Sequence, residues 1–78
     1  MTQLEKAIAR LRERSGEARI DDVRRVLAAL GYQEVRQHGS HITFVHPRRR
    51  RFTVPVSHGK AVKRVYVVQV LEEVDLDE

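Results

Sequence analysis

The sequence predicts an α+β fold, in which a three-stranded antiparallel meander packs against helices and a further helix precedes this unit. Three observations support the prediction. Apolar residues recur at helical spacing within residues 2–14 and 20–30, which is typical of helices that bury one face. From residue 32 to residue 55 the spacing falls to about two, as in half-buried strands. The length of 78 residues fits a single domain.

Two helices are expected before the meander. The first spans residues 2–14 and presents three apolar side chains on one face (Leu4, Ile8 and Leu11). It is either a separate extension or an integral part of the domain, and the sequence leaves both open. The second helix is expected to be capped by Asp21 or Asp22 and to end at Gly31, a residue suited to the left-handed conformation that follows many helices.

The meander and a last helix follow. Strands are expected over residues 32–37, 40–46 and 51–54, with a tight turn at His38–Gly39. Alternation places Ile42 and Phe44 on the core side and His41 on the open side. The final helix is expected over residues 62–74. The chain is thus divided into an N-terminal helical extension (1–19), a domain (20–74) and an acidic tail (75–78), which frays because its charge opposes the helix dipole.

Charge is unevenly distributed along the chain. The net charge is +4 at pH 7, yet residues 35–71 hold eight basic and no acidic residues, whereas residues 72–78 hold five acidic and no basic ones. A basic stretch of this length without acidic residues favours a phosphate-bearing partner such as nucleic acid. A basic surface without a specific partner is the alternative interpretation.

Composition excludes several classes of protein. The longest apolar run covers residues 26–30, far short of the roughly 20 residues of a membrane helix, and no secretory signal is expected. Because the chain has no cysteine, it has no disulfide, thiolate metal site or cysteine nucleophile. Its four aromatic residues do not support a base-stacking platform for single strands. We expect a cytoplasmic protein.

Two short motifs stand out in the middle of the chain. A Gly-Ser-His sequence occupies residues 39–41, and a Val-Pro-x-x-His sequence occupies residues 54–58. Between Ile20 and Leu71 these motifs, with the surrounding residues, resemble the HicA family of toxin ribonucleases from toxin–antitoxin systems. The other matching residues are Leu30-Gly31-Tyr32, Arg36-Gln37-His38, Phe44, Pro47, Thr53, Lys60 and the valine-rich final helix.

The resemblance implies a fold like that of double-stranded-RNA-binding domains, cleavage of mRNA, and neutralisation by a HicB-type antitoxin. It also implies that the histidine of the Gly-Ser-His motif, His41, is the catalytic residue. From the residues alone, an ordinary surface histidine on a strand is the simpler interpretation of His41, and the resemblance favours the catalytic one.

RNA cleavage requires no nucleophile from the protein, because the 2′-hydroxyl attacks the adjacent phosphorus. A general base accepts the hydroxyl proton, and a general acid protonates the leaving 5′-oxygen. Histidine suits both roles, since its ordinary pKa is about 6.5. We therefore expect His41 and His58 as proton-transfer groups, with His38 a weaker candidate. A loop histidine that bonds the backbone near the final helix explains His58 equally well.

No metal or other cofactor is expected. His38 and His41 are three residues apart and His41 and His46 five apart, so that within a strand each pair would point to opposite faces. No carboxylate lies between residues 35 and 71. Cleavage should therefore proceed in the presence of a chelator.

The expected RNA contacts are basic and polar residues of the same stretch: Arg36, Ser40, Arg48, Arg49, Arg50, Arg51, Lys60, Lys63 and Arg64. The four consecutive arginines are also consistent with a solvated tip, or with a surface that an acidic antitoxin contacts. Two other functions remain open. One is a non-catalytic RNA-binding module on the same fold, and the other is a small interaction protein that uses its first helix and acidic tail.

Overall fold

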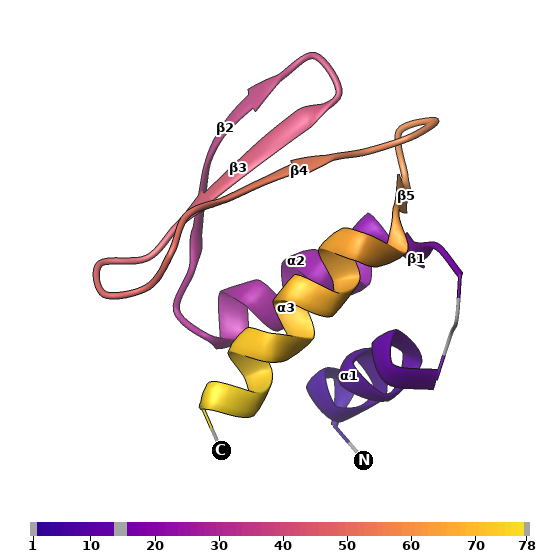
Figure 1. The fold of residues 1–78 in the computed structure, drawn as a ribbon, viewed down its shortest axis with the longest axis vertical. Helices are drawn as coiled ribbons and strands as arrows, with labels where there is room; N and C mark the ends of the chain where they lie inside the picture. Colours follow the sequence, from indigo (N-terminus) through magenta and orange to yellow (C-terminus); the bar gives the residue numbers. More distant parts are fainter. Residues whose placement is uncertain (1, 14–15, 78) are drawn as a thin grey trace.

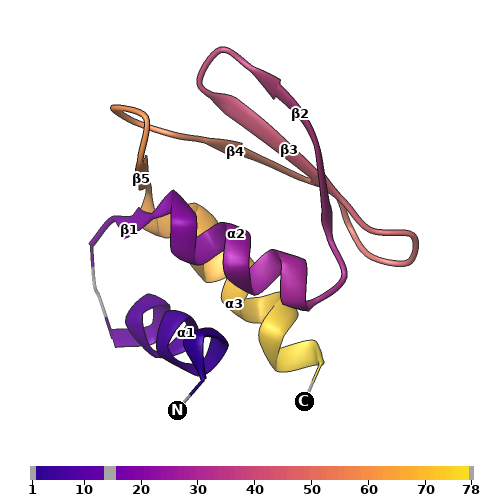
Figure 2. The ribbon, with the colours of Figure 1, turned by 180° about the vertical axis from the view of Figure 1, so that it is seen from behind.

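The computed structural model describes residues 2–13 and 16–77, in which helices cover one side of an antiparallel sheet (Figures 1 and 2). The elements follow in the order α1 (Gln3–Glu13), β1 (Ala18–Arg19), α2 (Ile20–Ala29), β2 (Gln33–His38), β3 (His41–Val45), β4 (Phe52–Pro55), β5 (Ala61–Val62) and α3 (Arg64–Leu76). The α+β class, the antiparallel meander and the additional N-terminal helix are confirmed.

The sheet is a meander of β2, β3 and β4, joined in sequence order by antiparallel pairing. Each strand boundary lies within one residue of the expected position. The inner face consists of four side chains that are at most 3% exposed (Ile42, Phe44, Phe52 and Val54). The alternation of the sequence therefore identified the core face correctly, and it leaves the other face of the sheet free of helices (Figure 1).

The turn between β2 and β3 lies one residue later than expected. His38 pairs with His41, so the loop consists of Gly39 and Ser40, and Gly39 has a φ of +60° that glycine adopts without steric cost. Because the chain reverses at this turn, residues directly opposite each other point to the same face of the sheet. The expectation that His38 and His41 point to opposite faces is therefore wrong, since it treated them as members of one strand.

Helices α2 and α3 lie beneath the sheet and share its core (Figure 2). The side chains of Val23, Leu27, Val67 and Val70 are fully buried there. Gly31 follows α2 with a φ of +99°, as expected for a residue that ends a helix.

The start of α2 differs from the expectation. The helix begins at Ile20 after Arg19, and no side chain caps it. Asp21 and Asp22 lie inside the first turn, where their charge still complements the helix dipole. The assignment of either aspartate as the cap is therefore wrong, and Asp22 instead accepts two hydrogen bonds from Arg10, of 3.0 and 2.8 Å.

Helix α1 packs directly on the other two helices. Its Ala7 and Leu11 are fully buried in the common core. Arg64 at the start of α3 donates a 2.7 Å hydrogen bond to the Leu11 carbonyl. At the opposite end, Thr2 and Glu5 form a reciprocal capping box, with bonds of 2.9 and 3.0 Å. Arg14, the expected last residue of this helix, lies outside the described residues.

A two-residue ribbon of β1 and β5 joins the beginnings of α2 and α3. Ala18 pairs with Val62, and the Ile20 amide donates a 2.8 Å hydrogen bond to the Lys60 carbonyl. The sequence did not reveal this ribbon, because two residues are too few to show a period of two. Val62 consequently belongs to a strand, and α3 begins at Arg64 rather than at residue 62.

The end of α3 also differs from the expectation. The helix continues to Leu76, with Asp77 as its C-cap, whereas fraying was expected from Asp75. Ion pairs of Asp75 with Arg12, at 2.8 Å, and of Asp77 with Arg49 explain the difference, because both connect the acidic end to basic side chains of other elements. Glu78 lies outside the described residues. No helix in residues 2–13 and 16–77 is long and apolar enough to cross a membrane.

Candidate functional site

The open face of the sheet carries a polar hollow beside the β2–β3 hairpin. Four side chains line it: His38, His41, Thr43 and Thr53, one or more from each strand of the meander. Its volume is about 370 Å³, and it opens widely to solvent. The two threonine hydroxyls lie 3.4 Å apart across β3 and β4. The hollow thus has a hydroxyl-lined floor and two imidazoles at one end.

The two imidazoles of the hollow are not engaged elsewhere. His38 and His41 are exposed, and neither imidazole forms a hydrogen bond or ion pair with another described residue. His46 provides a contrast, because its Nδ1 accepts a 3.0 Å hydrogen bond from the Arg48 amide and its ring centre lies 5.1 Å from that of Tyr32. His46 is therefore a packing residue at the strand end, whereas His38 and His41 present their imidazoles to the open hollow.

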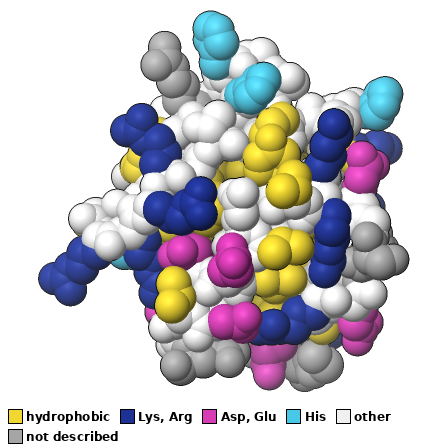
Figure 3. Space-filling view, viewed as in Figure 1, with side chains coloured by type: hydrophobic (Ala, Val, Ile, Leu, Met, Phe, Trp, Pro, Cys, Tyr) yellow, Lys and Arg dark blue, Asp and Glu magenta, His cyan; other side chains and the backbone are white. Residues whose placement is uncertain are grey.

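His58 lies in the loop between β4 and β5, outside the hollow. Pro55 pairs with His41, and the Val56 amide donates a 2.7 Å hydrogen bond to the Ser40 carbonyl. The end of β4 therefore lies beside the hairpin, and His58 follows three residues later with a φ of +54°. Histidine side chains gather at the upper edge of the molecule (Figure 3). The structure does not bring His58 and His41 into the same hollow.

The four consecutive arginines have different surroundings. Arg48 and Arg51 are exposed. The Arg50 guanidinium lies 5.0 Å from the centre of the Phe52 ring, a distance at which a cation and an aromatic face attract each other. Arg49 is turned toward α3, with its side chain only 20% exposed. The run is therefore not a uniformly solvated tip.

Arg49 connects the β3–β4 loop to the end of α3. Its guanidinium donates to the Glu73 carbonyl at 3.1 Å and forms ion pairs with the carboxylates of Glu73 and Asp77. The Tyr32 hydroxyl completes this cluster by donating to the Arg50 carbonyl at 2.8 Å. Burial, and next the negative charge of Glu73, raise the pKa of Tyr32. Since Arg49 already has two carboxylate partners, its contact with RNA is the least supported of the four.

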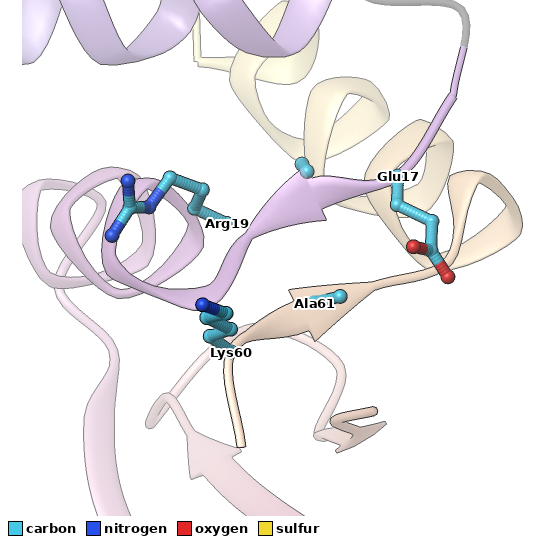
Figure 4. Close-up of a pocket in the computed structure, with 5 residues that line it drawn as sticks. Glu17, Arg19, Lys60 and Ala61 are labelled. Atoms are coloured by element: carbon cyan, nitrogen blue, oxygen red, sulfur yellow. The ribbon is translucent and has the colours of Figure 1, made fainter. Parts of the chain in front are cut away.

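Three of the expected cations lie at the N-terminal end of α3. Lys60 and Lys63 are exposed, and Arg64 is half-buried beneath α1. Beside the β1–β5 ribbon, Lys60 and Arg19 extend to the same side, and Glu17 lies at the other end of the ribbon (Figure 4). The ribbon thus adds Arg19 to the basic residues that the sequence indicated.

The two remaining predicted contacts lie on the hairpin. Ser40 is exposed in the two-residue loop. Arg36 stands opposite Thr43 in the strand register, and its side chain lies outside the described part of the structure. Within residues 2–13 and 16–77, no group of three or more histidine, aspartate or glutamate side chains is placed to hold a metal ion.

A comparison with models of known protein families identifies the family of this chain. The family model described as the HicA toxin of bacterial toxin–antitoxin systems matches residues 20–76. This match spans most of the chain. The chain belongs to the HicA family. No curated protein and no solved structure matches it significantly.

Membership of the HicA family establishes three properties. The protein is a toxin-type member of a toxin–antitoxin system, its family implies an antitoxin partner, and its fold is the double-stranded-RNA-binding-domain-like fold of that family. The matched segment begins at Ile20 and contains the whole hollow, whereas α1 lies before it. The additional helix therefore belongs to the same core as the HicA unit without being part of the family pattern.

His38, which was expected only as a weaker candidate, lines the same hollow as His41. The signal for it was present, because a Gly-Ser pair between two histidines at the end of alternating strands is typical of a two-residue hairpin loop. Reading the loop as Gly39–Ser40 would have placed His38 opposite His41. Thr53 also lines the hollow, and its position follows from its register opposite Thr43.

Proposed function

We propose that this HicA toxin is an endoribonuclease that cleaves mRNA in the cytoplasm through His41 and is neutralised by a HicB-type antitoxin. The observation that carries the proposal is the exposed imidazole of His41 in a polar hollow, where no described residue forms a hydrogen bond with its ring. A catalytic imidazole must reach a substrate proton directly. A packing role, like that of His46, would instead bury the ring against its neighbours.

The proposed reaction follows from RNA chemistry. The 2′-oxygen forms a bond to the adjacent phosphorus while the bond from phosphorus to the 5′-oxygen breaks. The 2′-hydroxyl proton passes to a base on the enzyme, and a proton from an acid on the enzyme passes to the 5′-oxygen. The products are a 2′,3′-cyclic phosphate and a 5′-hydroxyl. His41 transfers one of these two protons, and the reaction requires no protein nucleophile.

The basic residues supply the binding energy for the phosphates in this proposal. Double-stranded-RNA-type domains bind the shape of A-form RNA through phosphates and 2′-hydroxyls. The exposed cations nearest to that role here are Lys63 at the start of α3, Lys60 in the β4–β5 loop and Arg51 beside the sheet. Arg36, Ser40 and the other arginines of the loop remain proposed contacts. Binding through such residues weakens as the salt concentration rises.

Growth of bacteria that express the protein tests the proposal. Expression of the native chain from an inducible promoter is expected to stop growth and to degrade mRNA, and the His41→Gln variant at an equal protein level should do neither. His58→Asn offers a control, because His58 is exposed and does not line the hollow. Asparagine is the replacement because it tolerates the positive φ of this position. Growth arrest by His41→Gln as complete as that by the native protein would refute the role of His41.

A non-catalytic RNA-binding module on the same fold is the second candidate. The basic residues at the start of α3 support it, because they do not depend on His41. Purified native protein distinguishes the two functions in the presence of EDTA. RNA that is retarded in a gel at low salt but stays intact would support the module, whereas shortened RNA supports the nuclease.

A further inference from the structure

The β2–β3 hairpin places a second histidine next to His41. His38 and His41 are cross-strand partners on either side of the two-residue loop. Side chains at such positions point to the same face, with their Cβ atoms about 4.5–5.5 Å apart. Both line the same hollow. Two imidazoles therefore line the same open, polar hollow.

This spacing suits a reaction that moves two protons at once. In an in-line displacement the attacking and leaving oxygens lie on opposite sides of the phosphorus. A base and an acid must accordingly reach the phosphate from two sides, which a single imidazole cannot do within one step. Two imidazoles on neighbouring strands supply the base and the acid as separate groups.

In the described part of the chain, no side-chain interaction that stabilises the fold accounts for the presence of a histidine at either position. Both are exposed, and neither imidazole forms a hydrogen bond or ion pair within the described part of the chain, whereas His46 packs on Tyr32 and accepts a backbone hydrogen bond. His58 is also exposed, but it does not line the hollow. Of the described histidines, His38 is thus the one that shares the open hollow with His41.

We infer that His38, and not His58, is the second proton-transfer group, so that His38 and His41 act as an acid–base pair on the scissile phosphodiester. One imidazole accepts the 2′-hydroxyl proton, and the other, in its protonated form, donates a proton to the leaving 5′-oxygen. After cleavage the pair holds the same number of protons in exchanged positions. The inference rests on the proposed ribonuclease function.

Few charged residues lie near His38 and His41 in the described part of the chain. No acidic side chain lines the hollow. On the strands, Arg36 stands next to the pair in the register, opposite Thr43, and β4 contributes Thr53 and no ionisable group. The β4–β5 loop contributes His58 and Lys60. No helix covers this face (Figure 1). Among the side chains that line the hollow, the two imidazoles are therefore the groups that can exchange a proton with a substrate at neutral pH.

Cleavage rates of a short RNA, measured against pH in EDTA, test the inference. The native protein is expected to give a bell-shaped profile. His38→Gln should lower the maximal rate by about a hundredfold or more and remove one limb of the bell. His58→Asn should leave both the rate and the two limbs within about threefold of native, because this side chain lies outside the hollow. A His38→Gln rate within threefold of native, with both limbs retained, would overturn the inference.

A modified substrate shows which of the two histidines is the general acid and which is the general base. When sulfur replaces the 5′-bridging oxygen, the leaving group departs as a thiolate and needs no proton, since the pKa of a thiol is about 8.5. One of the variants His38→Gln and His41→Gln should regain a rate near native on this substrate, and the other should not. Rescue of neither, or of both, contradicts an acid–base pair.

The outcomes distinguish a failure of the proposed role of His38 from a failure of the proposed ribonuclease function. If the native protein cleaves no RNA, the ribonuclease proposal itself fails. If it cleaves RNA and only His41→Gln is inactive, the inference about His38 fails alone. Loss of native cleavage in EDTA, with recovery on addition of Zn²⁺, would also overturn the inference, because the two imidazoles would then serve as metal ligands.

Discussion

Replacement of Leu11 by alanine tests whether α1 is an integral part of the fold. Leu11 is fully buried, in one core with α2, α3 and the sheet. A buried Leu→Ala substitution costs about 2–5 kcal/mol, because the lost transfer free energy adds to that of the cavity. We expect a loss of about 3 kcal/mol here. For a domain of this size, that loss lowers the Tm by about 12–24 °C.

Urea unfolding followed by circular dichroism measures this loss. The midpoint should fall while the slope stays constant, because the whole molecule unfolds in one transition. Leu76→Ala is the matched control, since this leucine is 76% exposed and its replacement should change the free energy of unfolding by less than about 0.5 kcal/mol. A similarly small effect of Leu11→Ala, or a separate transition for α1, would refute an integral helix.

Three further substitutions test other parts of the structure. Gly31→Ala should destabilise the protein by more than about 1 kcal/mol, because alanine is strained at a φ of +99° and its Cβ would lie 3.0 Å from Nε2 of His46; an unchanged urea midpoint would contradict this. Tyr32→Phe should remove part of the loss of stability above pH 10. The raised pKa of Tyr32 keeps its proton on the folded state after the unfolded state has lost it, so stability is present below pH 10 and falls as the pH rises further; equal pH slopes in the two proteins would contradict this. Arg49→Gln should lower the Tm and Arg51→Gln should not, because Arg49 forms ion pairs at the end of α3 and no such pair joins Arg51 to a described residue. Arg51→Gln should instead reduce the salt dependence of RNA binding by about one ion. The reverse pattern would refute the distinct roles of the two arginines.

Sequence periodicity predicted the core of this protein well. The alternation of Ile42 and Phe44, and the helical spacing around Val23, depend on burial that repeats over several residues, and burial dominates the choice of fold. The left-handed conformation of Gly31 was predictable for a related reason, since few other residues adopt it at a helix end.

Contacts between distant segments were not predictable from the sequence. The β1–β5 ribbon joins residues 18–19 to residues 61–62, and neither segment is long enough to show a pattern. The ion pairs of Arg49 and Arg12 with the end of α3 depend on how the helices pack, which no local rule encodes. These contacts explain why the acidic end is helical where its local charge favours fraying.

The candidate site was predictable in part. The resemblance to the HicA family indicated His41 as a candidate, and strand alternation correctly placed it on the open face. The pairing with His38 was missed because it depends on a turn position, and a shift of one residue reverses which side chains face each other. The position of His58 outside the hollow could not be predicted from the sequence, because it depends on the path of the β4–β5 loop.

The most direct test of the account measures cleavage and binding of the same RNA by native protein and by His41→Gln, in EDTA and at low salt. The account predicts that the native protein cleaves the RNA, and that His41→Gln binds it with an affinity within about threefold of native but does not cleave it. Cleavage by His41→Gln at the native rate would contradict the central claim. Intact RNA with the native protein, despite binding, would contradict it equally.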